Sequence, residues 1–287
     1  MNKIVTFLIL CVLISCKKES AETIIPIDPN LKLYGNWVGD FEVSKTDTAT
    51  SNQEDYVYSY KINLVLKKIV SDKLYGYSIV AGHKLPLLGV MKYEDGTAHF
   101  IVKEPLSHKQ TGKYDFVIAQ DSLKGTWHAF DSKAKVLERE FILLKQKFKY
   151  NPNAMLPREQ SYVDYSSSKI DSIKEVVDGV EETYYDEMFR SASAAILHLN
   201  ASTMILKEKD LKNLKKLDLE IIRNTIFARH GYTFKKKSFR QFFDPVDWYI
   251  PIKENVSGDL TRIEQQNIVL INRFQKYAED HYDSFGR

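Results

Sequence analysis

The sequence predicts an α+β multidomain protein, with an N-terminal antiparallel β-barrel-like meander followed by a mainly helical C-terminal module. Two patterns lead to this expectation. Residues 33–148 hold 8 of the 12 glycines and alternate apolar with polar side chains, which is typical of half-buried strands. From residue 203 on, apolar residues instead recur at spacings of three and four, which is typical of helices packed along one face.

The start of the chain has the pattern of a secretion signal. Lys3 precedes an apolar run, Ile4–Ile14, that is shorter than the roughly 20 residues a membrane-spanning helix needs. The run ends in Leu13-Ile14-Ser15-Cys16, which resembles the lipobox of bacterial lipoproteins. The resemblance implies that residues 1–15 are removed and that Cys16 is lipidated. The alternative is a plain secretory signal followed by a chance cysteine.

The lipobox resemblance also implies a location. Acyl chains on Cys16 would anchor the protein to a membrane outside the cytoplasm. Lys17 and Lys18 follow, with no Asp at the second mature position. We therefore expect the outer membrane of a Gram-negative bacterium, on its periplasmic or outer face. Residues 16–32 are polar and are expected to form a tether.

The amino-acid composition excludes several kinds of site. Cys11 would leave with the signal and Cys16 would carry lipid, so no thiol remains for a disulfide, a zinc site or a cysteine nucleophile. The 41 Lys and Arg against 38 Asp and Glu give no strong basic excess, which argues against nucleic acid as a partner. Serine-hydrolase, zinc-protease and nucleotide-binding motifs are missing from the sequence. We expect no enzyme activity, cofactor or metal.

The alternating segments of residues 33–148 predict the meander. Ile62, Leu64 and Leu66 lie on one face of a strand, and Leu137–Leu143 forms the last such strand. Turn residues such as Glu94-Asp95-Gly96 separate the segments at spacings of about 8–12 residues. Such spacing favours an up-and-down meander that closes into a small barrel.

The first strand begins with Gly35-Asn36-Trp37, which resembles the Gly-x-Trp start of lipocalin-like barrels. This resemblance implies a structural pair in which Arg139, on the last strand, packs across Trp37. It also implies a cavity for a small apolar ligand. The alternative is a barrel filled by its own side chains.

Two further segments lead into the C-terminal module. Residues 149–181 are polar and are expected to link the domains, while residues 182–287 are expected to be helical. Within the helical region, Glu182–Leu199 has an apolar stripe at helical spacing. Asp218 is placed to cap a helix that ends at His230 and Gly231. A second helix should begin near Leu260, where Thr261 and Glu264 have the spacing of a capping box.

The ordered motifs of this region, Arg223–Tyr232, Trp248-Tyr249, Ile263-Glu264 and Asn267-Ile268, resemble the YARHG domain. That domain is a small extracellular bacterial module found in lipoproteins and beside peptidase or kinase domains. The resemblance covers about 205–280, and Phe227 stands where the family name has Tyr. The resemblance therefore identifies the type of domain but implies no chemical reaction.

Two interpretations of the motif stay open. The polar motif residues either hold the aromatic segment 242–249 in place or form a recognition pocket for a wall or surface polymer. The candidate ligand-binding residues are Arg223, Asn224, Arg229, His230, Tyr232, Trp248 and Tyr249.

Lys207–Arg240 carries 11 basic and 4 acidic residues, so it is either a solvated basic face or a site for an anionic envelope polymer or peptidoglycan. The function hypothesis is a non-catalytic binding or assembly module for a cell-wall or surface component. The alternatives are a lipocalin-like carrier and an accessory or catalytic module acting on envelope polymers. The oligomeric state stays open.

Overall fold

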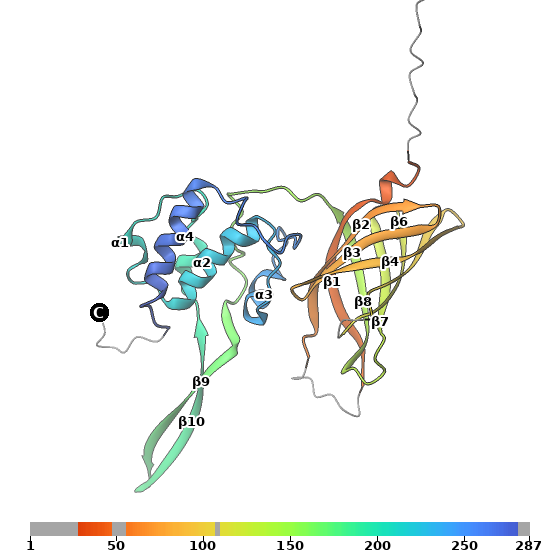
Figure 1. The fold of residues 1–287 in the computed structure, drawn as a ribbon. Coiled ribbons are helices and arrows are strands. Elements are labelled where there is room, and N and C mark those ends of the chain that lie inside the picture. Colours follow the sequence, from red (N-terminus) through yellow and green to blue (C-terminus); the bar gives the residue numbers. More distant parts are fainter. Residues whose placement is uncertain (1–27, 48–55, 107–109, 281–287) are drawn as a thin grey trace, which may run out of the picture.

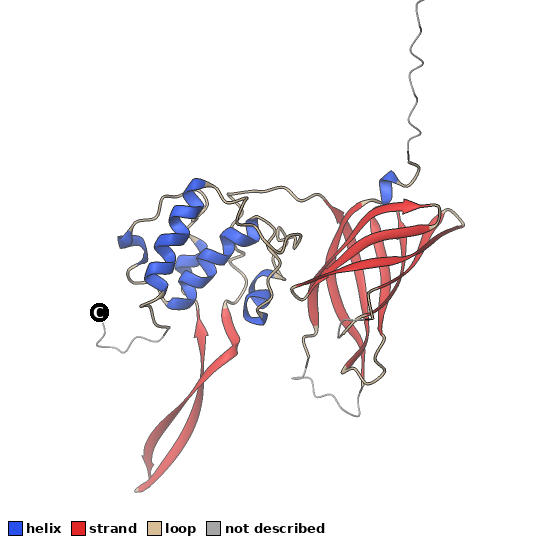
Figure 2. Cartoon of the chain, viewed as in Figure 1, coloured by secondary structure: helices blue, strands red, loops and turns tan. Residues whose placement is uncertain are grey.

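The computed structural model describes residues 28–47, 56–106 and 110–280 (Figure 1). An N-terminal barrel is followed by a helical unit, and a long two-stranded hairpin projects from the helical unit (Figure 2). The expected signal peptide, Cys16 and most of the expected tether lie outside the described residues. Among the described residues, no helix is both long and apolar enough to cross a bilayer.

The N-terminal unit is a closed eight-stranded antiparallel barrel, which confirms the predicted meander. Each strand pairs with the next, and β8 returns to pair with β1. The short 3-10 helix η1 (Leu31–Leu33) precedes the first strand. The strands are β1 (Gly35–Thr46), β2 (Ser59–Val70), β3 (Lys73–Val80), β4 (His83–Glu94), β5 (Thr97–Lys103), β6 (Gly112–Ala119), β7 (Ser122–Ala129) and β8 (Val136–Gln146).

Side chains fill the interior of the barrel. Phe100 and Phe116 stack with ring centroids 4.8 Å apart, and Tyr114 is fully buried beside them in the same core. Glu104, also buried, accepts hydrogen bonds from the Ser78 hydroxyl at 2.6 Å and the Tyr114 hydroxyl at 2.9 Å. A core packed with aromatic rings and a satisfied carboxylate agrees with the alternative of a barrel filled by its own side chains.

The predicted contact between Arg139 and Trp37 is wrong. Arg139 lies opposite Val43 in the β1–β8 register, six residues and roughly 20 Å along the strand from Trp37. Its guanidinium lies over the rings of Phe41 and Tyr60, while Lys145 lies over Trp37 at 5.7 Å. Both Trp37 and Arg139 are buried, but they stabilise different parts of the barrel.

The helix predicted over Glu182–Leu199 is also wrong. Strands β9 (Val163–Val177) and β10 (Val180–Ser191) form an antiparallel hairpin, so β9 occupies the second part of the expected 149–181 linker. The tight turn is Asp178-Gly179, where both residues have positive φ, 53° and 79°. Asp-Gly is a favoured sequence for such a turn, and β-branched and aromatic neighbours favour strands. Only η3 (Ala194–Leu197) remains helical in the predicted segment.

The helical unit contains α1 (Glu208–Leu211), α2 (Lys216–Arg229), α3 (Lys237–Phe243) and α4 (Arg262–Gln275). Helices α2 and α4 pack together around one apolar core. Asp218 caps α2 from the third helical position, and Gly231 follows the helix with φ 75°. The predicted capping box of Thr261 and Glu264 is present at the start of α4.

Candidate functional site

The buried carboxylate of Glu264 lies at the centre of the helical unit. It accepts a hydrogen bond from the Tyr150 hydroxyl at 3.0 Å and lies 2.8 Å from His230 Nε2. Its capping contact with the Thr261 backbone N–H adds a third partner at 2.8 Å. The Tyr150 ring stacks on His230 with ring centroids 4.3 Å apart. The carboxylate therefore joins the end of α2, the start of α4 and the chain that leaves the barrel.

Hydrogen bonding keeps Glu264 ionised. Burial by itself raises the pKa of this carboxyl, but hydrogen bonds from His230, Ser202 and the Thr261 backbone more than offset burial and lower the pKa to about 2. Burial and the neighbouring Glu264 raise the pKa of Tyr150 to about 12, so its hydroxyl stays a donor at neutral pH. With His230 and Glu264 only 4% and 0% exposed, a polymer in solvent does not reach this pair.

Arg229 forms a second set of buried contacts. Its Nε donates to the Ala154 carbonyl at 2.8 Å and its Nη1 to the Ser202 hydroxyl at 2.9 Å. Burial lowers the pKa of Arg229 to about 10, which leaves it charged at neutral pH. Trp248 Nε1 donates to the neighbouring Met155 carbonyl at 2.8 Å. Arg229 and Trp248 thus hold the segment that follows the barrel against the helices.

The remaining candidate ligand-binding residues also contact other parts of the protein, apart from the side-chain nitrogen of Asn224. Arg223, half-buried on α2, donates to the side-chain oxygens of Asn272 and Gln275 on α4. The Tyr249 hydroxyl donates to the Tyr232 carbonyl at 2.7 Å. Asn224 is buried, and its Nδ2 has no hydrogen-bond partner among the described residues. The structure therefore brings the predicted residues together as an internal framework.

Sequence reasoning missed several partners in this framework. Asn267 is 1% exposed, accepts from the Leu206 backbone at 3.0 Å and donates to the Ala201 carbonyl at 2.8 Å. The sequence places Asn267 among the motif residues but does not indicate which backbone groups it binds. No sequence pattern indicated Tyr150 or Ser202, because each lies in an irregular segment without a repeating spacing of apolar residues.

The barrel and the helical unit meet through polar contacts of β2. Lys61 Nζ donates to the Val246 carbonyl at 2.5 Å, and its backbone N–H donates to Asp244 at 3.3 Å. Asn63 Nδ2 donates to the Pro251 carbonyl at 2.9 Å. Burial raises the pKa of Asp244 to about 7, although the Lys61 backbone contact acts in the opposite direction. β2 therefore docks the loop that follows α3.

An open cleft of ≈ 1250 Å³ lies beside this contact, between the outer wall of the barrel and residues 244–247. The charged side chains that line it are Asp40, Glu42, Lys61, Lys124, Glu140, Asp244 and Asp247. Five carboxyl groups against two lysines make the cleft unsuitable for an anionic polymer. Across the described ranges, no group of three or more His, Cys, Asp or Glu side chains could hold a metal ion.

A basic surface forms where the barrel touches the start of α3. A Cβ placed on Gly82 would lie 2.6 Å from both the Phe234 carbonyl oxygen and Lys235 Cα, so the two backbones are in direct contact. The exposed Lys84 follows Gly82, and the exposed Lys235–Lys237 begins at the contact. We call the four side chains of Lys84 and Lys235–Lys237 the lysine patch. Residues more than 150 positions apart in the sequence thus share one surface.

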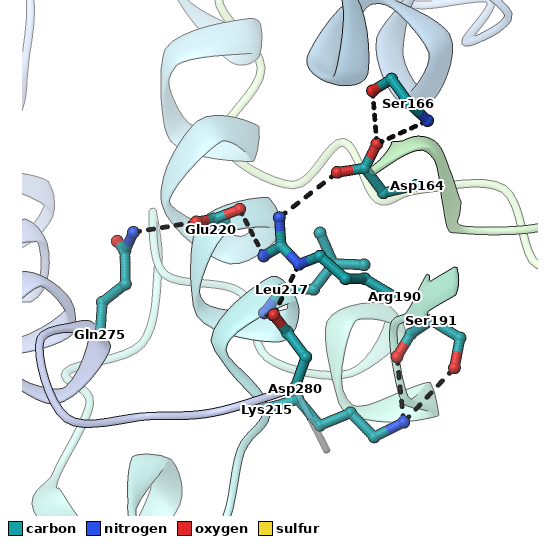
Figure 3. A network of polar contacts seen from close by, with 9 residues as sticks. All are labelled: Asp164, Ser166, Arg190, Ser191, Lys215, Leu217, Glu220, Gln275 and Asp280. Carbon is teal, nitrogen blue, oxygen red and sulfur yellow. Dashed lines mark hydrogen bonds and ion pairs between the residues drawn. The ribbon is translucent and has the colours of Figure 1, made fainter. Parts of the chain in front are cut away.

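The base of the hairpin is fixed by Arg190 of β10 (Figure 3). Its guanidinium donates to Asp280 at 2.6 Å, Glu220 at 2.9 Å and Asp164 at 3.3 Å. These carboxylates come from the C-terminal segment, α2 and β9. We call these four residues the Arg190 cluster. Because all four side chains are largely buried, the cluster joins the hairpin to the helical unit.

Comparisons with known proteins agree with the helical unit. The model of the YARHG domain matches residues 194–276, which include η3 and all four α-helices. The match begins before the expected boundary near residue 205 and leaves out the whole β9–β10 hairpin. Comparison with curated proteins and with solved structures finds no match to the chain.

Proposed function

We propose that this chain is an envelope-anchored bacterial lipoprotein that acts by non-catalytic binding of an anionic wall or surface polymer. The lipobox-like segment that ends at Cys16 supports the anchor, because lipid on that residue would hold the folded units at a membrane surface. In this proposal the YARHG motif maintains the fold, and exposed surfaces make the contacts with the envelope.

The lysine patch is the observation that carries the proposal. Its four side chains are exposed, and none is paired with a carboxylate among the described residues. Lys84 lies over the Tyr77 ring at 4.7 Å and Lys236 over the Phe239 ring at 4.8 Å, so aromatic contacts help to position two of the ammonium groups. A preformed group of unpaired cations is suited to phosphates or carboxylates that repeat along a polymer.

Burial argues against the alternative of catalysis. His230 and Glu264 have the residue types of an acid–base pair and lie 2.8 Å apart. Neither side chain is open to a substrate, and Glu264 already caps α4. The motif therefore supports a structural role, whereas the lysine patch supports a binding role.

The binding proposal is tested by charge reversal. We expect the triple variant K84E, K235E and K236E to bind lipopolysaccharide or purified peptidoglycan at least about tenfold more weakly, since each lysine near an anionic surface contributes about 1 kcal/mol. The matched control reverses three exposed barrel lysines, Lys67, Lys92 and Lys133. Sedimentation with peptidoglycan and light-scattering titration with lipopolysaccharide measure the two affinities.

A second variant tests the surface without a change in charge. Gly82→Ala places a Cβ against the Phe234 and Lys235 backbone, so it should separate the two halves of the patch and also weaken binding. Equal weakening by the control triple, or no binding of the wild-type chain to either material, would contradict the proposed site.

The anchor is tested independently. A Cys16→Ser chain expressed with its leader should fail to incorporate radiolabelled palmitate and should move from the membrane fraction to the soluble fraction. A Cys11→Ser chain is the matched control, since Cys11 lies inside the expected leader. Unchanged labelling of Cys16→Ser would rule out this residue as the lipid attachment site.

A further inference from the structure

Large apolar side chains are exposed to solvent on both faces of the β9–β10 hairpin. Its exposed apolar side chains include Ile170 (68%), Val176 (71%) and Tyr185 (76%) on one face and Ile173, Val180 and Tyr184 on the other. A two-stranded ribbon with no third strand or covering helix is marginally stable in water, and both of its edges are open. Exposed apolar groups gathered on one element in this way mark interaction surfaces.

The same hairpin carries unbalanced negative charge. Residues 165–189 contain seven Asp and Glu against two Lys, a formal charge of −5. Glu175 lies directly opposite Glu182, and directly opposed like charges destabilise a strand pair. The apolar pairs Val177–Val180 and Ile173–Tyr184 flank these two carboxylates on one face. The face therefore suits a partner that offers cations together with apolar side chains.

A surface of that chemistry exists on the helical unit itself, along α4 and the segments beside it. On α4, Val269 is 72% exposed, and beyond the helix Tyr277 is 67% exposed. Asn267 binds the backbone of Met204 and Leu206, which holds the exposed Ile205 beside α4. Exposed basic side chains accompany these apolar groups, and they are Lys207, Lys209, Lys212, Arg273 and Lys276. Arg273 also forms an exposed ion pair with Glu208, so the net charge of the face is positive but smaller than this list. We call this surface the α1/α4 face.

The hairpin does not cover the α1/α4 face of its own chain. The Arg190 cluster fixes the base of the ribbon, and from there β9 and β10 project away from α1 and α4 (Figure 1). The α1/α4 face that the hairpin can contact is therefore that of another molecule. A basic and apolar surface of this kind is present on every copy of the chain.

We propose that two copies of this protein form a reciprocal dimer in which the hairpin of each copy docks on the α1/α4 face of the other. The contact places the Glu175–Glu182 pair against basic side chains such as Arg273 and Lys276. It also removes the apolar side chains of both surfaces from water. Because each copy receives a hairpin from the same copy to which it gives its own, the assembly closes as a dimer with twofold symmetry.

A pair of charge-reversal variants tests this arrangement in the chain from residue 17 on, produced without lipid. The hairpin variant is E175K with E182K, and the face variant is R273E with K276E. Analytical ultracentrifugation should give a dimer for the wild type, with a dissociation constant that rises at least about tenfold at about 1 M salt, where the Debye length is about 3 Å. Each variant alone should be monomeric. An equimolar mixture of the two should form a dimer, since both of its contacts then join opposite charges.

The outcomes discriminate clearly. A wild-type chain that stays monomeric at high concentration and low salt would overturn the proposal. If the face variant alone remained dimeric while the hairpin variant did not, the hairpins would be pairing with each other, and the docking surface would be wrong. Failure of the mixture to associate, with circular dichroism unchanged, would also reject it. The lysine patch is intact in both variants, so polymer binding is tested separately.

Discussion

Replacing Glu264 with Ala is expected to lower the free energy of unfolding of the helical unit by about 3–5 kcal/mol. The carboxylate is 0% exposed and bonds Tyr150, His230 and the Thr261 backbone N–H. Its removal leaves these donors buried without an acceptor and also removes the capping box of α4.

The measurement is urea unfolding followed by hydrogen exchange, which separates the helical unit from the barrel. Gln265→Ala is the matched control, because Gln265 is the next residue of α4 and is exposed. It should change stability by about 0.5 kcal/mol or less. Barrel amides should keep their protection in both variants. A Glu264→Ala effect no larger than that of Gln265→Ala would show that the framework does not stabilise the unit.

The same carboxylate gives a pH dependence whose sign follows from its pKa. The pKa falls from an unfolded value of 4.5 to about 2 in the folded chain. Because the folded pKa is the lower one, the ionised group contributes stability above about pH 4.5, and that contribution is lost as the pH falls toward 2. The contribution is about 3 kcal/mol. Glu264→Gln should therefore reduce the loss of stability across this range, as measured by urea midpoints at each pH.

The barrel could be predicted from the sequence because its signals are local. Alternation in segments such as Tyr114–Ile118 indicates which side chains face inward, and Glu94–Gly96 marks a turn between strands. The capping box of Thr261 and Glu264 was visible for the same reason, since a helix start is fixed by residues three positions apart.

Contacts between distant segments could not be predicted in this way. The resemblance to lipocalin-like barrels pairs Arg139 with Trp37, but the β1–β8 register decides which residue it contacts. The stack of Tyr150 on His230 depends on the path of an irregular segment. In residues 182–199 the apolar residues have helical spacing, but the Asp178-Gly179 turn directs the chain into a β-hairpin, and the segment up to Ser191 is a strand. Tertiary contacts at the Arg190 cluster then reinforce the strand conformation.

Replacing Arg190 with Met is expected to destabilise the junction between the hairpin and the helical unit by about 3–5 kcal/mol. The guanidinium is the shared partner of three buried carboxylates, from Asp164, Glu220 and Asp280 (Figure 3). Burial by itself lowers the pKa of Arg190, but the hydrogen bonds to Asp280 and Glu220 and the charges of these two carboxylates more than offset burial and raise the pKa. Without the cation, three nearby negative charges repel one another, and Asp280 is also less able to accept from the Leu217 backbone at the start of α2.

Lys174→Met provides the matched control, because it removes a cation from the same hairpin. The ion pair of Lys174 with Glu181 is exposed, with side chains 66% and 58% accessible, so its loss should change stability by no more than about 1 kcal/mol. Hydrogen exchange should then show Arg190→Met opening the base of the hairpin and the first turn of α2, while barrel amides stay protected. Combining Arg190→Met with Glu220→Gln should recover part of the loss, since one unpaired charge is removed. Equal effects of Arg190→Met and Lys174→Met would mean that the hairpin is held by packing alone, and that its direction away from the α1/α4 face does not depend on charge.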